Sequence, residues 1–258
     1  MKALLLILRK NRFRFAELVK RDFKQKYKRT VLGMTWSILS PLLHLLVMRL
    51  VFTQFFGRNA QYYTTYLFAG NLMFSYYKEA TSGGMNALMG NASIFTKINV
   101  PKYLFVLSKE VSAVINFLLT LVVFFVFVAI DRVPFSWTFF AILYPICTLT
   151  MFNIGVGMIL SALYVFFRDT RYIYDIFTLL LMYMSAIFYQ VDKYPLKVQR
   201  IFLLNPVYCN IKYVRVAVID GSLPSPAFHG LLLLYAAAAL FLGGWIYKKK
   251  NHQFLYYV

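Results

Sequence analysis

Residues 111–130 read VSAVINFLLTLVVFFVFVAI, a run without a charged side chain that ends at Asp131. A helix needs about 20 mostly apolar residues to cross the hydrocarbon core of a bilayer, so this run is long enough to span one. The whole chain of 258 residues is 60% hydrophobic and only 14% charged. Soluble domains carry roughly 25% charged residues. The sequence therefore predicts an all-α integral membrane protein.

Charge-poor windows on both sides of this run predict five further spans. The six expected transmembrane helices cover about 33–56, 60–80, 110–130, 138–165, 173–190 and 227–247. The fifth is unusually short, and the apolar run after it, Ile201 to Ile211, contains Asn205-Pro206 and cannot cross on its own. We therefore expect short re-entrant outer helices between spans five and six.

Residues 1–30 are predicted to form a cytoplasmic, basic, amphipathic interfacial arm that precedes a transmembrane domain over 31–258. Its apolar face repeats every four residues and consists of Phe15, Val19, Phe23 and Tyr27. Its polar face consists of Arg12, Arg14, Lys20, Arg21, Lys24, Lys26 and Lys28. A helix of this kind lies in the headgroup plane, with its apolar side at the acyl boundary.

The positive charges indicate the orientation. With six spans, 20 of the 28 Lys and Arg residues fall on the side that holds both termini, and only seven fall on the other. Cytoplasmic loops carry the excess of basic residues, so both termini are expected in the cytoplasm. The excess of basic residues on the cytoplasmic side accounts for the net charge of +19. We therefore expect no nucleic-acid partner.

Catalytic and energy-coupling motifs are missing from the sequence. It contains no GxxxxGK[ST] phosphate loop, no Ser–His–Asp set and no cluster of metal ligands. Cys147 and Cys209 are too few for a metal site and are expected to be structural thiols. The carboxylates fall outside the middle of the expected spans, which argues against a proton-driven carrier. We therefore expect a transport subunit without a cofactor or metal of its own.

Four segments together resemble the permease subunits of ABC transporters that export cell-surface polysaccharides such as O-antigen, teichoic acid, capsule and rhamnan. The segments are RDFKQKYKRTVLGMTWSILSP (21–41), NASIFTKINVPKYLFVL (91–107), YVFFRDTRY (164–172) and NPVYCNIKYVR (205–215). They occur in the order typical of that family and extend over nearly the whole chain.

The resemblance implies two copies of this permease in a bacterial inner or plasma membrane, together with two copies of a separate ATPase that binds ATP and Mg. Such a permease contacts its ATPase through a coupling helix in the first cytoplasmic loop. Here that helix maps to Asn91, Ile94, Phe95, Lys97, Ile98, Pro101 and Lys102. Its apolar members are expected to insert into a groove on the ATPase, while Lys97 and Lys102 steer the contact. The arm is expected to add a second contact, with the ATPase or with membrane lipids.

A lipid-linked polysaccharide presents flat C–H faces on which aromatic rings stack, and 19% of the residues are aromatic. Candidates for the channel wall are Trp36, Phe52, Phe56, Tyr183, Phe188 and Tyr189, of which we expect at most half to touch glycan. Asn205, Pro206 and Arg215 are expected at an outer gate. Gly155, Gly157 and Ser161 would permit close helix packing, either within one chain or between two copies.

Two other functions fit the same sequence. One is an ABC permease of this fold that exports a drug or a small lipid. The other is a membrane-embedded transferase acting on lipid-linked sugars, which would need acidic residues at the membrane surface. Asp169 and Asp175 are the closest such pair, and Arg171 between them suggests a structural ion pair instead.

Overall fold

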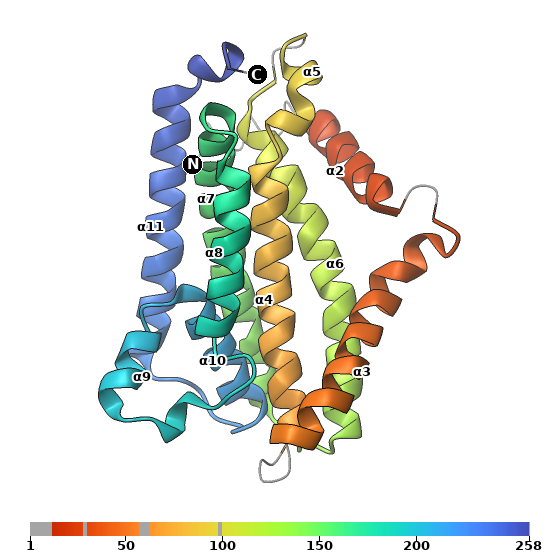
Figure 1. Cartoon of the computed structure of the whole chain (residues 1–258), viewed down its shortest axis with the longest axis vertical. Helices are drawn as coiled ribbons and strands as arrows, with labels where there is room; N and C mark the ends of the chain where they lie inside the picture. Colours follow the sequence, from red (N-terminus) through yellow and green to blue (C-terminus); the bar gives the residue numbers. More distant parts are fainter. Residues whose placement is uncertain (1–11, 28–29, 57–61, 98–99, 258) are drawn as a thin grey trace.

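The computed structural model describes residues 12–27, 30–56, 62–97 and 100–257. These residues form helices joined by short connections and contain no strand, which confirms the all-α class. The helices that overlap the six expected spans are α3 (Trp36–Phe56), α4 (Tyr63–Met85), α6 (Tyr103–Ile130), α7 (Leu143–Phe166), α8 (Thr170–Met184) and α11 (Pro226–Lys250). The other helices are α2 (Arg12–Tyr27), α5 (Ala92–Phe95), α9 (Leu196–Phe202) and α10 (Pro206–Val218). Figure 1 shows α2, α5 and the C-terminus at one end of the bundle, and α9 and α10 toward the other.

Three helices in the described part of the chain are both long and apolar enough to cross a membrane: α6, α11 and Trp137–Phe166, in which a 3₁₀ turn leads into α7. The helix α4 has 23 residues but carries polar side chains such as Asn71 and Ser75. The helix α8 has only 15 residues. The count of six spans therefore stays a prediction.

Some helix boundaries differ from the expected ones. The helix α6 begins at Tyr103 and not near residue 110, so Lys109 and Glu110 lie inside it. Conversely, α8 ends at Met184, and residues 185–190 are not helical. The backbone of Ala186 has a φ of 50°, in the left-handed region that ends helices.

Glycines let α7 pack very closely on both of its main neighbours. A Cβ atom built on Gly243 of α11 would lie 2.6 Å from the carbonyl oxygen of Gly155, and one built on Gly84 of α4 would lie 2.8 Å from the Cα of Gly157. The sequence left open whether these glycines pack within one chain or between two copies. The structure places Gly155 and Gly157 in contacts within the chain.

Hydrogen bonds between buried side chains reinforce this three-helix contact. The Tyr76 hydroxyl of α4 donates to Glu110 Oε1 of α6 at 2.6 Å and lies 2.7 Å from Thr150 Oγ1 of α7. Ser161 Oγ of α7 lies 2.6 Å from the Tyr247 hydroxyl of α11. Each of these bonds satisfies a polar group that would otherwise face apolar surroundings.

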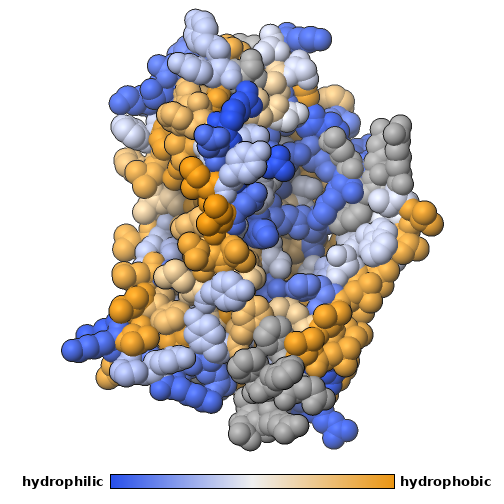
Figure 2. Space-filling model, viewed as in Figure 1, coloured by the Kyte–Doolittle hydropathy of each residue, from blue (hydrophilic) through white to orange (hydrophobic). Residues whose placement is uncertain are grey.

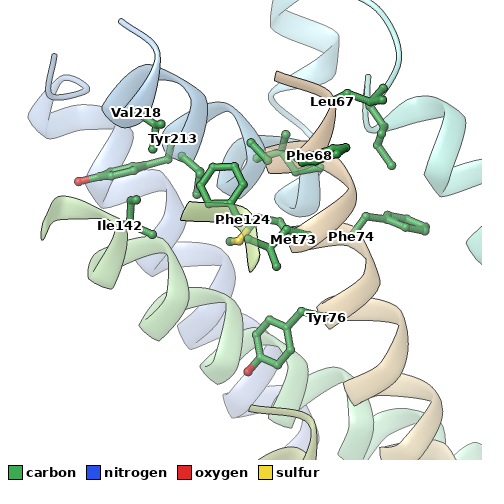
Figure 3. Close-up of a cluster of buried hydrophobic side chains, with 14 of the residues drawn as sticks. Leu67, Phe68, Met73, Phe74, Tyr76, Phe124, Ile142, Tyr213 and Val218 are labelled. Carbon is green, nitrogen blue, oxygen red and sulfur yellow. The ribbon is translucent and has the colours of Figure 1, made fainter. Parts of the chain in front are cut away.

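The main apolar core lies between α4, α6, α10 and the 3₁₀ turn before α7. Figure 3 shows Phe68 and Met73 of α4 beside Phe124 of α6, with Ile142 and Tyr213 closing the cluster. The Phe68 ring meets Phe127 edge to face, with the centroids 4.5 Å apart. This core joins the short helix α10 to the long helices of the bundle.

Replacing Gly243 by alanine is expected to destabilise the chain by about 1–3 kcal/mol, because the new methyl group overpacks the α7–α11 contact. The matched control is Gly244→Ala on the adjacent residue, where a Cβ would meet nothing within 4 Å. That control should preserve or slightly raise stability, since alanine favours helix over glycine. Thermal unfolding of the two purified variants makes the comparison, and equal stability would contradict the close α7–α11 contact.

Candidate functional site

The segment that joins α4 to α6 is held to the chain by its own side chains. Asn91 is buried, and its Nδ2 donates to the Ala87 carbonyl at 2.8 Å. Phe95 is only 5% exposed, and its ring centroid lies 5.9 Å from that of Phe105 at the start of α6. The predicted coupling segment is therefore a packed element rather than an open loop.

The C-terminal turn closes over this segment. Lys102 is only 8% exposed, and its Nζ donates to the backbone carbonyl of Asn251. The same Nζ lies 5.7 Å from the ring centroid of Phe254 and 6.0 Å from that of Phe95. Phe254 itself is fully buried. Burial lowers the pKa of Lys102 below its ordinary value.

These contacts correct part of the sequence-based picture. Phe95 and Lys102 do not project outward, because the chain's own tail and α6 surround them. Lys97 is exposed, and Ile94 and Pro101 are half-buried. Ile98 lies outside the described residues. An ATPase that binds this segment would therefore meet Ile94 and Lys97, while Asn91, Phe95 and Lys102 fix its shape.

The arm α2 is joined to the same region through Asp22, which is only 5% exposed. Its Oδ1 accepts from Arg21 Nη2 at 2.8 Å and lies 3.0 Å from Lys109 Nζ, and its Oδ2 accepts from Ser108 Oγ at 2.9 Å. Arg21 Nη2 also donates to Asn91 Oδ1 at 2.6 Å. Asp22 therefore connects the arm to α6, and Arg21 connects the arm to the coupling segment. We use the term arm junction for the region formed by Arg21, Asp22, Asn91, Ser108 and Lys109 together with Phe95, Lys102 and Phe254.

The buried face of the arm differs from the predicted one. Leu18 and Asp22, one helical turn apart, are buried against α6, whereas Phe15, Val19 and Phe23 are half-buried. Lys24 is exposed, and the Tyr27 side chain lies outside the described residues. The predicted apolar face therefore lies beside the contact with α6 and not at its centre, because the buried carboxylate of Asp22 is at the centre of that contact.

A polar cleft of about 590 Å³ lies between α3, α4 and α6, below the end of the arm. Its polar and aromatic lining consists of Lys26, Thr30, Trp36, Ser37, Ser40, His44, Asn71, Ser75, Tyr76, Glu79, Asn116, Phe117 and Thr120. Glu79 Oε1 accepts from Lys26 Nζ at 2.7 Å and from Asn116 Nδ2 at 2.6 Å. Figure 2 shows hydrophilic residues in a hollow flanked by the apolar surface of α3. Hydroxyl and amide groups in this number can bind a strongly hydroxylated ligand.

At the other end of the bundle, Arg215 holds segment 184–190, which is non-helical after Met184. Its guanidinium donates to the carbonyl oxygens of Ala186, Ile187 and Tyr66 at 2.9–3.2 Å and stacks on the Tyr66 ring at 3.4 Å. Gly70 leaves room for it, since a Cβ there would lie 2.6 Å from Arg215 Nη2.

Asn205 holds the start of the same segment. Its side-chain oxygen accepts from the backbone N–H groups of Val207 and Tyr208 and so caps α10, while its Nδ2 donates to Met184 O and Ser185 Oγ. Pro206 occupies the first turn of α10, where its missing N–H costs nothing. The three residues predicted at an outer gate thus lie around one segment.

The predicted channel aromatics fall into two separate groups. The rings of Tyr183 and Phe188 lie 6.4 Å apart, and the Tyr189 hydroxyl donates to the Tyr183 carbonyl at 2.7 Å. Tyr183 is 56% exposed, whereas Phe188 and Tyr189 pack partly against the main core. Trp36 instead lines the polar cleft. The side chains of Phe52 and Phe56 lie outside the described residues.

Sequence reasoning missed Asp22, Phe254 and the polar residues of α4 and α6 that line the cleft. Asn71, Ser75 and Asn116 all interrupt otherwise apolar windows, and that signal could have identified them. Asp22 follows Leu18 at helical spacing inside a basic segment, which also singles it out. No comparable signal identifies Phe254, because one aromatic residue in a tail has no periodic partner.

The sequence was compared with families and proteins of known role. A family model described as "ABC-2 type transporter" matches residues 14–219. The O-antigen export system permease protein RfbA of Myxococcus xanthus is 27% identical over 235 residues, covering 87% of this chain and 89% of that protein. A Klebsiella pneumoniae RfbA is 27% identical over 241 residues, covering 92% of each chain. The polysialic acid transport protein KpsM of Escherichia coli is 20% identical over 238 residues, covering 91% of this chain and 92% of that protein.

The family match includes the arm, the coupling segment, α7 and the segment held by Asn205 and Arg215. It therefore extends over both ends of the bundle and over the helix between them. From this match, the chain belongs to the ABC-2 type transporter membrane family.

Proposed function

We propose that this chain is the membrane-spanning permease of an ATP-driven exporter, which moves a lipid-linked cell-surface polysaccharide from the cytoplasm across a bacterial inner or plasma membrane. The observation that carries the proposal is the alignment of nearly the whole chain with proteins named as O-antigen export permeases and as a polysialic acid transport protein. These names favour a polysaccharide over a drug or a small lipid, and they favour transport over sugar transfer.

The energy would come from a separate ATPase subunit that binds ATP and Mg, because the chain itself has no phosphate loop. We propose two permeases and two ATPases in each exporter. The arm junction is the proposed docking region, since its coupling segment is rigidly packed and still exposes Lys97. A rigid docking element moves as a body with the ATPase, so that displacement at the ATPase reaches α4 and α6.

In the proposed topology, α3, α4, α6, α7, α8 and α11 cross the membrane, and both termini are cytoplasmic. The helices α9 and α10 would enter the membrane from the outer side and return. Irregular backbone is tolerated at membrane depth only where protein or a water-filled cavity surrounds it. The hydrogen bonds of Arg215 and Asn205 to segment 184–190 provide such surroundings.

The polar cleft would receive the sugars at the cytoplasmic side, where Trp36 offers an aromatic face beside serine and asparagine side chains. Near the outer side, the exposed ring of Tyr183 would offer a second stacking surface. Stacking on aromatic faces does not fix the register of a polymer, so the chain of sugars can slide past both points.

Replacing Ile94 by aspartate, or Lys97 by glutamate, is expected to reduce polysaccharide export about tenfold or more, because each change places a negative charge in the proposed ATPase contact. Co-purification of the ATPase and permease-dependent ATP hydrolysis should fall in parallel. Surface display of the polysaccharide in cells measures export.

The matched control is Lys197→Glu, which makes the same charge change on an exposed residue of α9 at the opposite end. It should leave export and ATPase binding unchanged. Normal export by the Ile94 and Lys97 variants, or an equal defect in the Lys197 variant, would contradict docking at the coupling segment.

Replacing Tyr183 by alanine is expected to reduce export several-fold while leaving assembly intact, because its exposed ring supplies a stacking surface worth about 1 kcal/mol. Phe241→Ala on α11 is the control, since Phe241 is also exposed, at 73%, but lies on a helix that forms neither proposed stacking point. Yield of the assembled complex is measured beside export. Loss of both quantities together would mean that Tyr183 acts in folding and not in transport.

A further inference from the structure

A groove of about 550 Å³ lies between α7 and α11 at the end where the C-terminal turn begins. Ile159 and Leu163 of α7 and Ile246 of α11 form part of its apolar floor. Lys249, Lys250 and the Tyr257 side chain lie at its mouth. The groove shares no lining residue with the polar cleft. Its lining also does not include Gly155, Gly243, Ser161 or Tyr247, which form the α7–α11 contacts described above.

The two lysines at the mouth have aromatic neighbours but no acidic partner. Lys249 Nζ lies 5.0 Å from the ring centroid of Trp245, and Lys250 Nζ lies 5.8 Å from that of Phe166. Among the described residues, neither lysine forms an ion pair with a carboxylate. Two positive charges are therefore held at a fixed place and are available to an anion.

The sides of the groove are exposed and largely apolar. The most apolar stretch of α11 is only 28% buried, the lowest share among the three spanning candidates. Leu163 is 41% exposed and Trp245 is 53% exposed. Indole rings such as that of Trp245 favour the membrane interface, which places the lysines one helical turn beyond it at headgroup level.

We propose that this groove binds one anionic phospholipid, with its phosphate at Lys249 and Lys250 and an acyl chain along Ile159 and Leu163. Basic pockets between transmembrane helices on the cytoplasmic side bind anionic headgroups, and here an apolar floor continues directly from the basic mouth. The proposal relies on the cytoplasmic placement of the C-terminus but not on the exported substrate. A free anion would use the two lysines alone and leave the apolar floor empty.

The groove is connected to the arm junction through the tail. The Phe166 ring, at the groove wall, lies 5.0 Å from Tyr257 and 5.8 Å from Phe254, centroid to centroid. Phe254 in turn packs beside Lys102 in the coupling segment. A lipid seated against Phe166 and Tyr257 therefore holds the tail in the position in which it supports the coupling segment.

Native mass spectrometry of the full-length chain in detergent tests the site by titration with phosphatidylglycerol, phosphatidylcholine or inorganic phosphate. The double variant Lys249→Gln/Lys250→Gln is expected to bind phosphatidylglycerol roughly 25-fold more weakly, from about a fivefold contribution of each lysine. The variant Lys193→Gln/Lys197→Gln removes the same charge from exposed positions elsewhere and should bind as the native chain does.

Leu163→Trp tests the apolar floor, because it fills the groove and leaves both lysines in place. It should also lose the bound phosphatidylglycerol. Equal binding of phosphatidylcholine, displacement of the lipid by millimolar phosphate, or full binding by either groove variant would overturn the proposal. Thermal unfolding without added lipid should be the same for all variants. If the double lysine variant unfolds early, Lys249→Gln alone replaces it, and if Leu163→Trp unfolds early, Leu163→Phe replaces it.

Discussion

The structure depends on the close approach of α7 to two neighbours. Within a bilayer, apolar helices gain little from leaving lipid, so their association depends on van der Waals contact and on hydrogen bonds between helices. Gly155 and Gly157, two residues apart, lie against α11 and α4 respectively. The coupling segment follows α4 and the tail follows α11, so this packing also sets the distance between Lys102 and Asn251. The arm junction therefore depends on glycines in the middle of the bundle.

Two buried charges hold the irregular parts of the chain at opposite ends. Asp22 has three partners on α2 and α6, and Arg215 has three backbone carbonyls and an aromatic ring. Removing one partner of a buried charge costs about 3–5 kcal/mol, because the other is left without compensation. Each charge therefore fixes one geometry: Asp22 sets the angle of the arm, and Arg215 sets the path of the 184–190 segment. In the proposed exporter, an ATPase at one end moves the permease. Fixed links transmit this movement through the bundle, whereas a flexible connection would not.

Composition and the spacing of charges predicted the all-α class and the approximate helix windows, because lipid imposes a strict length and polarity on a spanning helix. The family resemblance, and not composition, assigned Asn205 and Arg215 to one outer gate, although it could not give their shared segment. It did not predict that Phe95 and Lys102 turn inward, since the residue that covers them, Phe254, lies far away in the sequence. It also grouped Trp36 and Tyr183 as channel candidates without indicating that they lie in different regions, because periodicity identifies a helix face but not the helix that this face contacts. For Gly155 and Gly157 the sequence identified the packing residues and left the partner open.

The central claim is that this chain provides the membrane path and a separate subunit provides the hydrolysis of ATP. Reconstitution in liposomes measures it most directly, with lipid-linked polysaccharide in the membrane and the permease present with or without its ATPase. Glycan exposed to the far side is detected by a glycosidase that cannot cross the membrane. Transfer that requires both subunits and ATP is the predicted result. Transfer by this chain alone, or ATP hydrolysis by the purified chain, would contradict the account.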